Sequence, residues 1–169
     1  IQYSDRIISA IGRINQLVDS MMKLTRIESM DTEKSQVDLS TVADQAWIIT
    51  DTAGAVLNID NSMPVVTANQ SQVYQMFENF FRNAVEHAGE DAVITVGPID
   101  SSGFYVEDNG DGIPIDKRDR VFDLGVTYAQ EGTGLGLTII QRVVKQHNWT
   151  IKISDSQTGG ARFEVRFSN

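Results

Sequence analysis

Two side-chain amides, Asn79 and Asn83, stand four positions apart in a stretch with helical periodicity. At that spacing on a helix they project from the same face. The apolar residues of the same stretch would form its buried face: Met76, Phe77, Phe80, Phe81 and Val85. The pair is therefore predicted at the edge of a core, where it is either a ligand site or two ordinary surface amides.

A second polar motif, Asp108-Asn109-Gly110-Asp111-Gly112, follows a predicted strand. All of its residues favour turns, so a simple turn is one interpretation. A calcium loop would use Glu107, Asn109 and Asp111 as ligands and Gly112 at the bend. It fails because the bidentate carboxylate expected six residues after that glycine falls on Arg118.

A third motif places Gly132, Gly134 and Gly136 at the entry to an apolar helix that begins at Leu135. Such an entry offers backbone N–H groups and the positive end of the helix dipole to an anion. It is not a P-loop, because no Gly-Lys-Ser/Thr follows. It does not have the Rossmann spacing, because Ile139 stands where the third glycine is required.

Composition limits the classes of partner. The 169 residues, 41% of them hydrophobic, suffice for one core with an appendage. A net charge of −9 argues against a nucleic-acid surface and against contact with anionic membranes. Cysteine is absent, and no apolar run is long enough to span a bilayer. We expect a cytoplasmic piece of a longer protein.

The elements that must position these motifs begin with a helix over residues 4–29. Its apolar positions alternate in steps of four and three: Ile7, Ile11, Ile14, Val18 and Met21. One helix cannot bury such a face alone, so it should pack on a partner chain or on a further helix. Residues 1–30 are predicted as this bundle helix, 31–36 as a linker and 37–169 as one domain.

Within that domain, Ser40 is the expected N-cap of the first helix, Gly89 ends the second, and Asn148 suits a left-handed cap after the last. Neighbouring strands joined by tight turns predict an α/β two-layer sandwich with a mixed, largely antiparallel sheet, preceded by one amphipathic bundle helix. Strands are expected at 37–39, 56–59, 65–67, 92–96, 104–107, 149–154 and 162–167, and helices at 40–52, 71–88, 117–122 and 135–146.

In this order and spacing, the three motifs resemble the ATP-binding domain of sensor histidine kinases. That family shares its Bergerat-type fold with gyrase B subunits, MutL and Hsp-type chaperones. The resemblance spans residues 37–167 and ends on Gly160-Ala161-Arg162-Phe163, which is similar to the family's closing strand behind the adenine. It implies ATP and Mg²⁺ as cofactors.

The resemblance also assigns roles at the base and the metal. The carboxamide oxygen of Asn83 would hold Mg²⁺, which completes its octahedron with phosphate oxygens and water. The Asp108 carboxylate would accept a hydrogen bond from the exocyclic amine of adenine, where guanine presents a carbonyl. Gly110 and Gly112 would let the backbone approach the base. His87 would lie beside the adenine or ribose, unless it is only an exposed helix-end histidine.

The third motif would bind the phosphates through Gly132, Gly134, Leu135 and Gly136. Two positions depart from the family. Glu86 stands where many relatives place a phosphate-binding lysine, so Arg82 or a basic residue after Asp116 would supply the charge. Gly125 replaces a second lid aromatic three residues after Phe122, so the lid should be loosely held.

Asn79 decides between branches of the superfamily. The ATPase relatives carry a general-base glutamate there, and an amide cannot act as a base. Asn79 and Asn83 are therefore predicted as catalytic residues of phosphoryl transfer, not of hydrolysis. An ATPase or chaperone-like switch and a degenerate nucleotide-binding module remain the alternatives.

The helix predicted over residues 4–29 resembles the second of the two helices in the dimerisation and phosphoacceptor hairpin of sensor histidine kinases. The acceptor histidine is absent, because His87 and His147 are the only histidines and neither has acceptor-like neighbours. The resemblance implies a homodimer through residues 4–29, an acceptor helix on the same or the partner subunit, and a response regulator receiver domain as partner.

Overall fold

The computed structural model describes residues 33–50, 54–89, 91–123 and 134–168, together with Ile7, Ala10, Ile11, Gly12, Ile14, Val18, Met21 and Met22 of the N-terminal segment. The main elements follow in this order: β1 (Ser35–Asp38), α2 (Leu39–Ile49), β2 (Val56–Ile59), β3 (Val65–Ala68), α3 (Gln70–Ala88), β4 (Val93–Ile99), β5 (Gly103–Asp108), the 3-10 helix η1 (Ile115–Lys117), α4 (Gly136–Gln146), β6 (Thr150–Asp155) and β7 (Ala161–Arg166).

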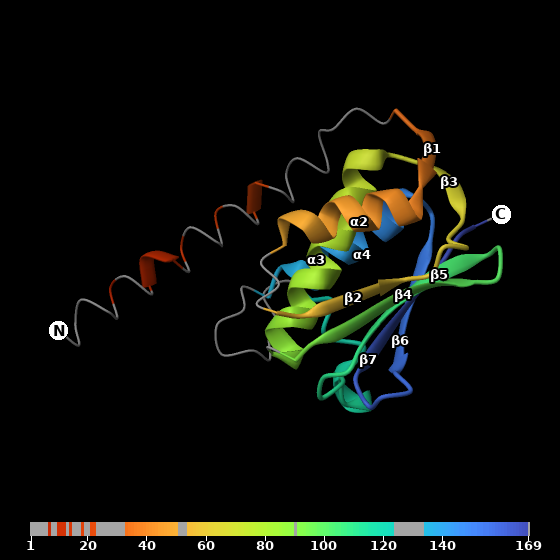
Figure 1. Cartoon of the computed structure of the whole chain (residues 1–169). Coiled ribbons are helices and arrows are strands. Elements are labelled where there is room, and N and C mark those ends of the chain that lie inside the picture. Colours follow the sequence, from red (N-terminus) through yellow and green to blue (C-terminus); the bar gives the residue numbers. More distant parts are fainter. Residues whose placement is uncertain are drawn as a thin grey trace.

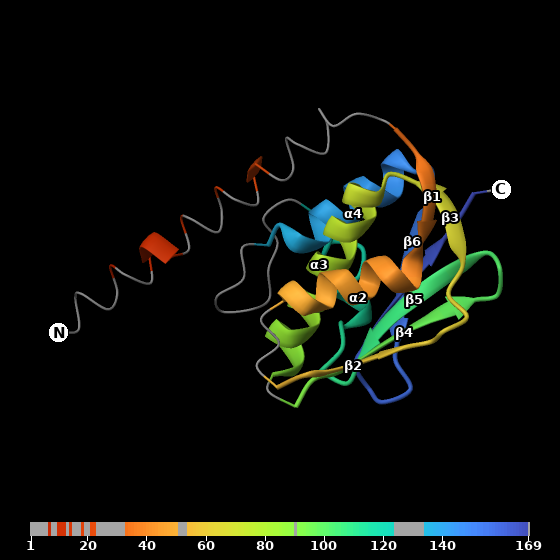
Figure 2. The same cartoon turned by 45° about the horizontal axis from the view of Figure 1, so that its top comes forward.

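Two layers make up the domain. A five-stranded sheet has the order β2-β4-β5-β7-β6, and α2, α3 and α4 lie together on one of its faces (Figures 1 and 2). β2 runs parallel to β4, whereas the other three pairings are antiparallel. β1 and β3 form a separate antiparallel pair. The predicted two-layer sandwich with a mixed, largely antiparallel sheet is confirmed.

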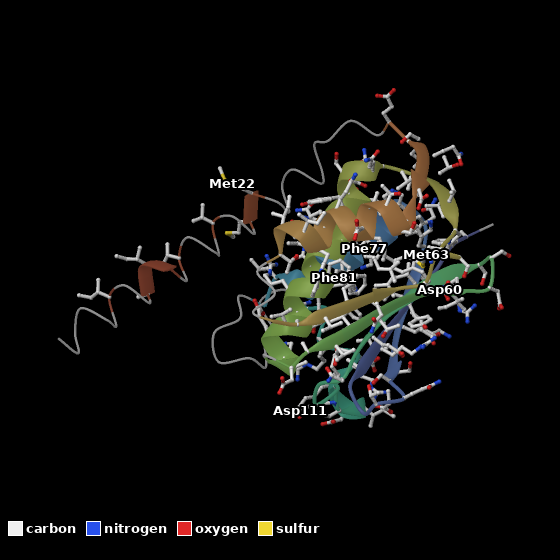
Figure 3. The ribbon with its side chains drawn as sticks, in the orientation of Figure 1. Met22, Asp60, Met63, Phe77, Phe81 and Asp111 are labelled. Atoms are coloured by element: carbon white, nitrogen blue, oxygen red, sulfur yellow. The ribbon has the colours of Figure 1, made fainter. Side chains whose placement is uncertain are left out.

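The core fills the space between the helices and the sheet. Phe77 on α3 contacts both Phe81 of the same helix and Phe104 of β5, with ring centroids 5.8 and 5.2 Å apart. Trp47 of α2 meets Phe81 edge-on at 5.5 Å. In Figure 3, Phe77 and Phe81 lie in the interior of the domain. These rings hold α2 and α3 against the sheet and so fix the helix that carries the amide pair.

Both predicted hairpins form. β4 and β5 pair from Ile94↔Asp108 to Ile99↔Gly103, and β6 and β7 pair from Thr150↔Arg166 to Asp155↔Ala161. The first hairpin is longer than predicted, because pairing continues through Pro98 to the turn. The outcome that matters for the site is that β5 ends at Asp108 and β7 begins at Ala161, side by side in the sheet.

The predicted start of α2 was wrong. Asp38, not Ser40, is the N-cap: its Oδ1 accepts hydrogen bonds from Ser40 N at 3.0 Å and Thr41 N at 3.2 Å. The Ser40 hydroxyl, which donates to the same oxygen at 2.7 Å, lowers the pKa of Asp38 most, and the backbone bonds act in the same direction. Leu39 therefore opens the helix and does not extend the strand. The helix ends at Ile49, short of the predicted Thr52, where Thr50 N closes a tighter turn on Trp47 O.

The helix predicted at 117–122 was also wrong. Only Lys117 of that segment belongs to the 3-10 helix η1, and turns follow it, with a single helical bond from Val121 N to Lys117 O at 3.1 Å. Lys117 N donates to Pro114 O at 2.9 Å, and Arg120 N donates to Lys117 O at 3.0 Å. Bonds that close three residues back favour a short 3-10 segment over a continuous α-helix.

The other helices form as predicted. α3 is capped by Asn69, whose side chain accepts from Gln72 N at 3.0 Å, and it ends at Gly89 with φ +75°. Asn148 adopts φ +57° after α4, in the left-handed region predicted for it. The structure thus positions α3 and α4, the two helices that carry the amide and glycine motifs.

The described residues of the N-terminal segment are helical, and their large apolar side chains are exposed. Ile7, Ile11, Ile14 and Val18 are 59, 52, 58 and 48% exposed, and Met22 points away from the domain in Figure 3. The rest of the helix predicted over residues 4–29, and residues 31–32 of the predicted linker, fall outside the described residues. Ser35 and Gln36, placed in that linker, instead open β1, two residues before the predicted strand start, because they pair with Ala68 and Thr67 of β3. The division into a bundle helix and a domain stays a prediction. Among the described residues, no helix combines the length and apolarity needed to cross a membrane.

Candidate functional site

The side chain of Asp108 is fixed by backbone donors at the end of β5. It is 7% exposed, and its Oδ1 accepts hydrogen bonds from Gly110 N at 2.9 Å and Ala161 N at 3.2 Å. Within the described parts of the chain, Oδ2 takes part in no hydrogen bond. One carboxylate oxygen is therefore locked to the protein, and the other can accept a bond from a ligand.

Burial raises the pKa of Asp108, outweighing the two N–H bonds and the nearby positive charge of His87, which act in the opposite direction. A buried carboxylate is stabilised by any additional donor that reaches it. Gly110 lies against both Asp108 Oδ1 and Ala88, the residue after the exposed His87 at the end of α3. The structure thus brings the predicted base-binding carboxylate and the predicted flanking histidine together.

Gly110 and Gly112 are close-packed against protein. A Cβ at Gly110 would lie 3.2 Å from the Cβ of Ala88 at the end of α3. Gly112 has φ +70°, and a Cβ there would lie 3.0 Å from Gly159 O. The predicted role of these glycines was to make room for a base. The structure adds a second reason: the segment passes between α3 and the β6–β7 turn.

Asn83 lies against the start of α4. Its Nδ2 is buried and, among the described residues, has no hydrogen-bond partner. A Cβ at Gly136 would come within 2.7 Å of Asn83 Oδ1, so only glycine permits this approach without displacement. An orphaned buried amide next to a helix N-terminus is the kind of group that a bound ligand satisfies.

The glycine motif forms the entry to α4. Gly134 has φ +67°, and Leu135, 4% exposed, occupies the N-cap position with no side-chain cap. The first turn of a helix presents N–H groups that have no acceptor within the helix. Gly132, the first glycine of the motif, lies outside the described residues.

Asn79 is turned into its own helix. It is fully buried; its Nδ2 donates to Gln75 O at 2.6 Å and its Oδ1 accepts from Arg82. Arg82 also lies 4.0 Å from Glu78 and 3.9 Å from Glu86. The cation suggested for phosphate binding is therefore engaged by two carboxylates and an amide, and Asn79 holds it in that place.

Arg118, in the loop after Asp116, is engaged as well. Its Nε donates to Ile113 O at 2.8 Å and its Nη2 pairs with Asp155. It fastens the loop after β5 to the end of β6. Phosphate neutralisation by either of these arginines would require them to leave their present partners.

The ligand set of the rejected calcium loop is dispersed. Glu107 pairs with Arg162 at 2.9 Å on the sheet, and Asn109 Oδ1 accepts from Val93 N at 2.8 Å. Asp111 is exposed, at the edge of the domain in Figure 3. Across the described residues, no group of three His, Cys, Asp or Glu side chains converges as a metal site. A cation here would depend on amide and ligand oxygens.

Three residues that contact Asp108 were missed from the sequence. The backbone N–H of Ala161 reaches Asp108 from β7, and the hydroxyls of Ser156 and Thr158 reach its carbonyl from the β6–β7 turn. The available signal was the run of small and hydroxyl residues before the closing strand, which marks a turn but not its target.

Known proteins resemble this chain in sequence and in fold. Residues 68–169 match the family described as histidine kinase-, DNA gyrase B- and HSP90-like ATPase. The sensor histidine kinase ZraS of Escherichia coli O157:H7 is 28% identical over 162 residues, covering 90% of this chain and 35% of ZraS. The sensory histidine kinase/phosphatase NtrB of Azospirillum brasilense is 30% identical over 190 residues, covering 96% of this chain and 44% of NtrB.

The full-length ShkA structure, in complex with AMPPNP, superposes on 97% of this chain and 37% of its own, with a TM-score of 0.73 and 23% identity. That similarity shows the fold. The chain spans less than half the length of both sequence relatives. It belongs to the histidine kinase-, DNA gyrase B- and HSP90-like ATPase family, as an ATP-binding domain of the sensor histidine kinase type.

Proposed function

We propose that this chain is the catalytic part of a two-component sensor histidine kinase. It binds ATP and transfers the γ-phosphate to a histidine on a dimerisation helix, for relay to a response regulator aspartate. The observation that carries the proposal is the Asp108 carboxylate, which is fixed through Oδ1 and leaves Oδ2 to a ligand. The buried Asn83 Nδ2, with no partner among the described residues, adds support.

Adenine specificity follows from that carboxylate. A carboxylate only accepts hydrogen bonds, and adenine offers its exocyclic amine as donor. Guanine presents a carbonyl in the same position, so two acceptors would face each other in a buried place. His87 flanks the base or the ribose from the end of α3.

Magnesium fits the residues present. Mg²⁺ usually takes one or two protein ligands and completes its octahedron with water and phosphate oxygens. Asn83 supplies a neutral amide oxygen, and its orphaned Nδ2 would gain a partner among the phosphate oxygens. The metal would neutralise phosphate charge that Arg82, tied to Glu78 and Glu86, leaves uncompensated.

Transfer is favoured over hydrolysis because the position of the ATPase glutamate holds Asn79. Both polar atoms of that amide are bonded within α3, so it neither accepts a proton nor orients water. Positioning and electrostatics supply most of what phosphoryl transfer requires. Asn83 and the entry to α4 would provide them, with Asn79 holding α3 in shape.

The partners are those of a kinase core: the acceptor helix of the same or a partner subunit, and a receiver domain. The exposed apolar positions Ile7, Ile11 and Ile14 support dimerisation through residues 4–29. Ile14→Asp should then shift a concentration-dependent dimer to monomer in light scattering. A parent chain that is monomeric at high concentration would contradict this part of the proposal.

Calorimetric titration of the whole chain with ATP and GTP, with and without Mg²⁺, tests the central claim. We expect ATP to bind more tightly than GTP, and Mg²⁺ to strengthen ATP. A dimerisation hairpin carrying an acceptor histidine, added in trans, should then become labelled from γ-labelled ATP. Equal affinity for the two nucleotides, or no binding of either, would overturn the assignment and leave a scaffold domain.

A further inference from the structure

The backbone ladder between β5 and β7 ends just before the base-binding residue. The last paired residues are Glu107 and Arg162, and Asp108 lies one position beyond them. Side-chain atoms continue the pairing. Oδ1 of Asp108 accepts from Ala161 N, and the Asp108 carbonyl accepts from the Ser156 hydroxyl at 2.8 Å.

Ser156 lies in the β6–β7 turn, and both its hydroxyl and its backbone N–H are hydrogen-bonded. It is 7% exposed; its Oγ accepts from Gly160 N at 2.9 Å, and its backbone N donates to Gly160 O at 2.8 Å. Thr158, exposed on the same turn, lies 3.0 Å from the Ser156 hydroxyl and 3.3 Å from the Asp108 carbonyl. One buried hydroxyl thus joins both sides of the turn to the main chain of Asp108.

The turn and the base-binding segment also interlock sterically. A Cβ at Gly160 would overlap both the carbonyl oxygen and Oδ1 of Asp108, and Gly112 packs on Gly159 O. The turn holds the Asp108 carbonyl, and Ala161, the residue that directly follows the turn, holds Oδ1 together with Gly110. The position of the turn therefore influences where Oδ2 points. A shift of the turn would move the acceptor that a base has to meet.

We propose that Ser156 is a positioning residue for base recognition, acting through Asp108 without touching the nucleotide. The inference rests on the proposed function, since it assigns the means by which the adenine-selective carboxylate is aimed. A positioning role can be told apart from a purely stabilising one. If the Asp108 carboxylate is misplaced, the preference for adenine over guanine falls, whereas a loss of folding stability alone leaves that preference unchanged.

The test compares Ser156→Ala with Ser156→Thr, which retains the hydroxyl, in the full chain. Ser102→Ala is the matched control: it removes a hydroxyl that donates to Ile99 O at 3.2 Å in the β4–β5 turn, at the opposite end of β5. ATP and GTP dissociation constants and the melting temperature are measured for each variant.

We expect Ser156→Ala to weaken ATP by about three- to tenfold, the range for one hydrogen bond, with GTP little changed. Ser156→Thr should restore most of the ATP preference, and Ser102→Ala should retain it. Combined with Asp108→Asn, Ser156→Ala should have little further effect, because the two residues act as a unit.

Thr158→Val is the milder second variant, removing a longer bond to the same carbonyl. It should lower the ATP preference by about twofold and remains readable if Ser156→Ala does not fold. An ATP-to-GTP ratio unchanged in both variants would overturn the inference, even if they melt earlier. A parent chain without preference for ATP would instead overturn the proposed function.

Discussion

The proposed base end of the site, around Asp108, and its proposed phosphate end, around Arg82, Asn83 and the entry to α4, are built differently. At the base end, Asp108 is held by two backbone N–H groups and by hydroxyls from the neighbouring turn. At the phosphate end, Asn83 has a buried Nδ2 with no partner among the described residues, and Arg82 is paired with acidic neighbours. The first region is preorganised by protein contacts, whereas the second has polar groups whose partners would come from the ligand.

This difference assigns nucleotide selectivity to the base end and phosphoryl transfer to the phosphate end. A fixed acceptor discriminates bases because it cannot move to suit the wrong one. An amide without a protein partner costs stability until a ligand satisfies it. Substitutions at the base end should therefore change which nucleotide binds, and those at the phosphate end should change what happens to its phosphate.

The largest effect is expected from Asn83→Ala. Removing the metal-binding amide should lower transfer to an acceptor helix on the order of a hundredfold or more, because metal stabilisation of the transferred charge contributes several kcal/mol. ATP binding without Mg²⁺ should change little. Labelling of the acceptor from γ-labelled ATP measures the first, and calorimetry measures the second.

Asn58→Ala, an exposed asparagine on β2, is the control and should leave transfer unchanged. Brisk release of phosphate from the pure chain that disappears in Asn83→Ala would contradict the kinase assignment. It would favour the ATPase alternative and make the phosphate end a hydrolytic site.

Asp108→Asn should act on the base end in two opposite ways. ATP binding should weaken by about 1.5–3 kcal/mol, the range for a hydrogen bond to a charged group. The unliganded chain should melt no lower at neutral pH. An asparagine Oδ1 can still accept from Gly110 N and Ala161 N. The substitution also removes a buried negative charge that is unfavourable, as the raised pKa of Asp108 indicates.

Asp111→Asn is the matched control, because it changes an exposed carboxylate on the same segment. It should alter neither the ATP affinity nor the melting temperature. If Asp108→Asn kept full ATP affinity, the base end would recognise something other than the adenine amine.

The sequence predicted most of the fold because its signals are local. Alternating strands around Ser101-Ser102-Gly103, and a helix closed by Gly89, depend on neighbours that a reader can see. The start of α2 was missed because Asp38 and Ser40 are both good N-caps and stand two positions apart. The structure decides between them, because Asp38 Oδ1 accepts from Ser40 N and Thr41 N.

The sequence names the motifs of the candidate site but not the hydrogen-bond partners of their side chains. The donors to Asp108 come from Ala161 and Ser156, far along the chain, and are set by the strand order. The pairing of Arg82 was different, since Glu78 and Glu86 stand four positions before and after it. Residues four positions apart on a helix form ion pairs, so the sequence alone could have predicted the pairing of Arg82.

The two helices of the phosphate end are joined at their far ends by His147. Its Nε2 accepts from Asn69 N at 3.0 Å, so the ring proton lies on Nδ1, which donates to Val143 O at 2.8 Å. Burial lowers the pKa of His147, with the charge of Lys34 acting in the same direction. Protonation would remove the acceptor that ties α4 to the start of α3.

The contribution of neutral His147 to folding stability should therefore be complete above the ordinary histidine pKa of about 6.5. It should decrease as the pH falls toward the lower pKa of His147 in the folded chain. His147→Gln should lower stability at pH 8 by about 1 kcal/mol and flatten this acid-side decrease. Asp108, whose raised pKa has the opposite effect, is common to both chains and cancels in the comparison. Parallel melting curves from pH 8 to 5 would show that His147 is not the titrating group.

The smallest effect is expected from Arg162→Lys, which tests which contacts orient the Asp108 carboxylate. On the sheet face away from the helices, Arg162 pairs with Glu107 and Glu164 and stacks on Tyr105, 3.6 Å from the ring centroid. Arg162→Lys keeps the charge but loses the planar stacking and the forked hydrogen bonds, so it should cost about 1 kcal/mol in urea unfolding. Because Asp108 is held from the β6–β7 turn, the ATP-to-GTP preference should not change. A fall as large as that predicted for Ser156→Ala would mean that this outer network, beside Asp108 in the same two strands, directs the carboxylate instead.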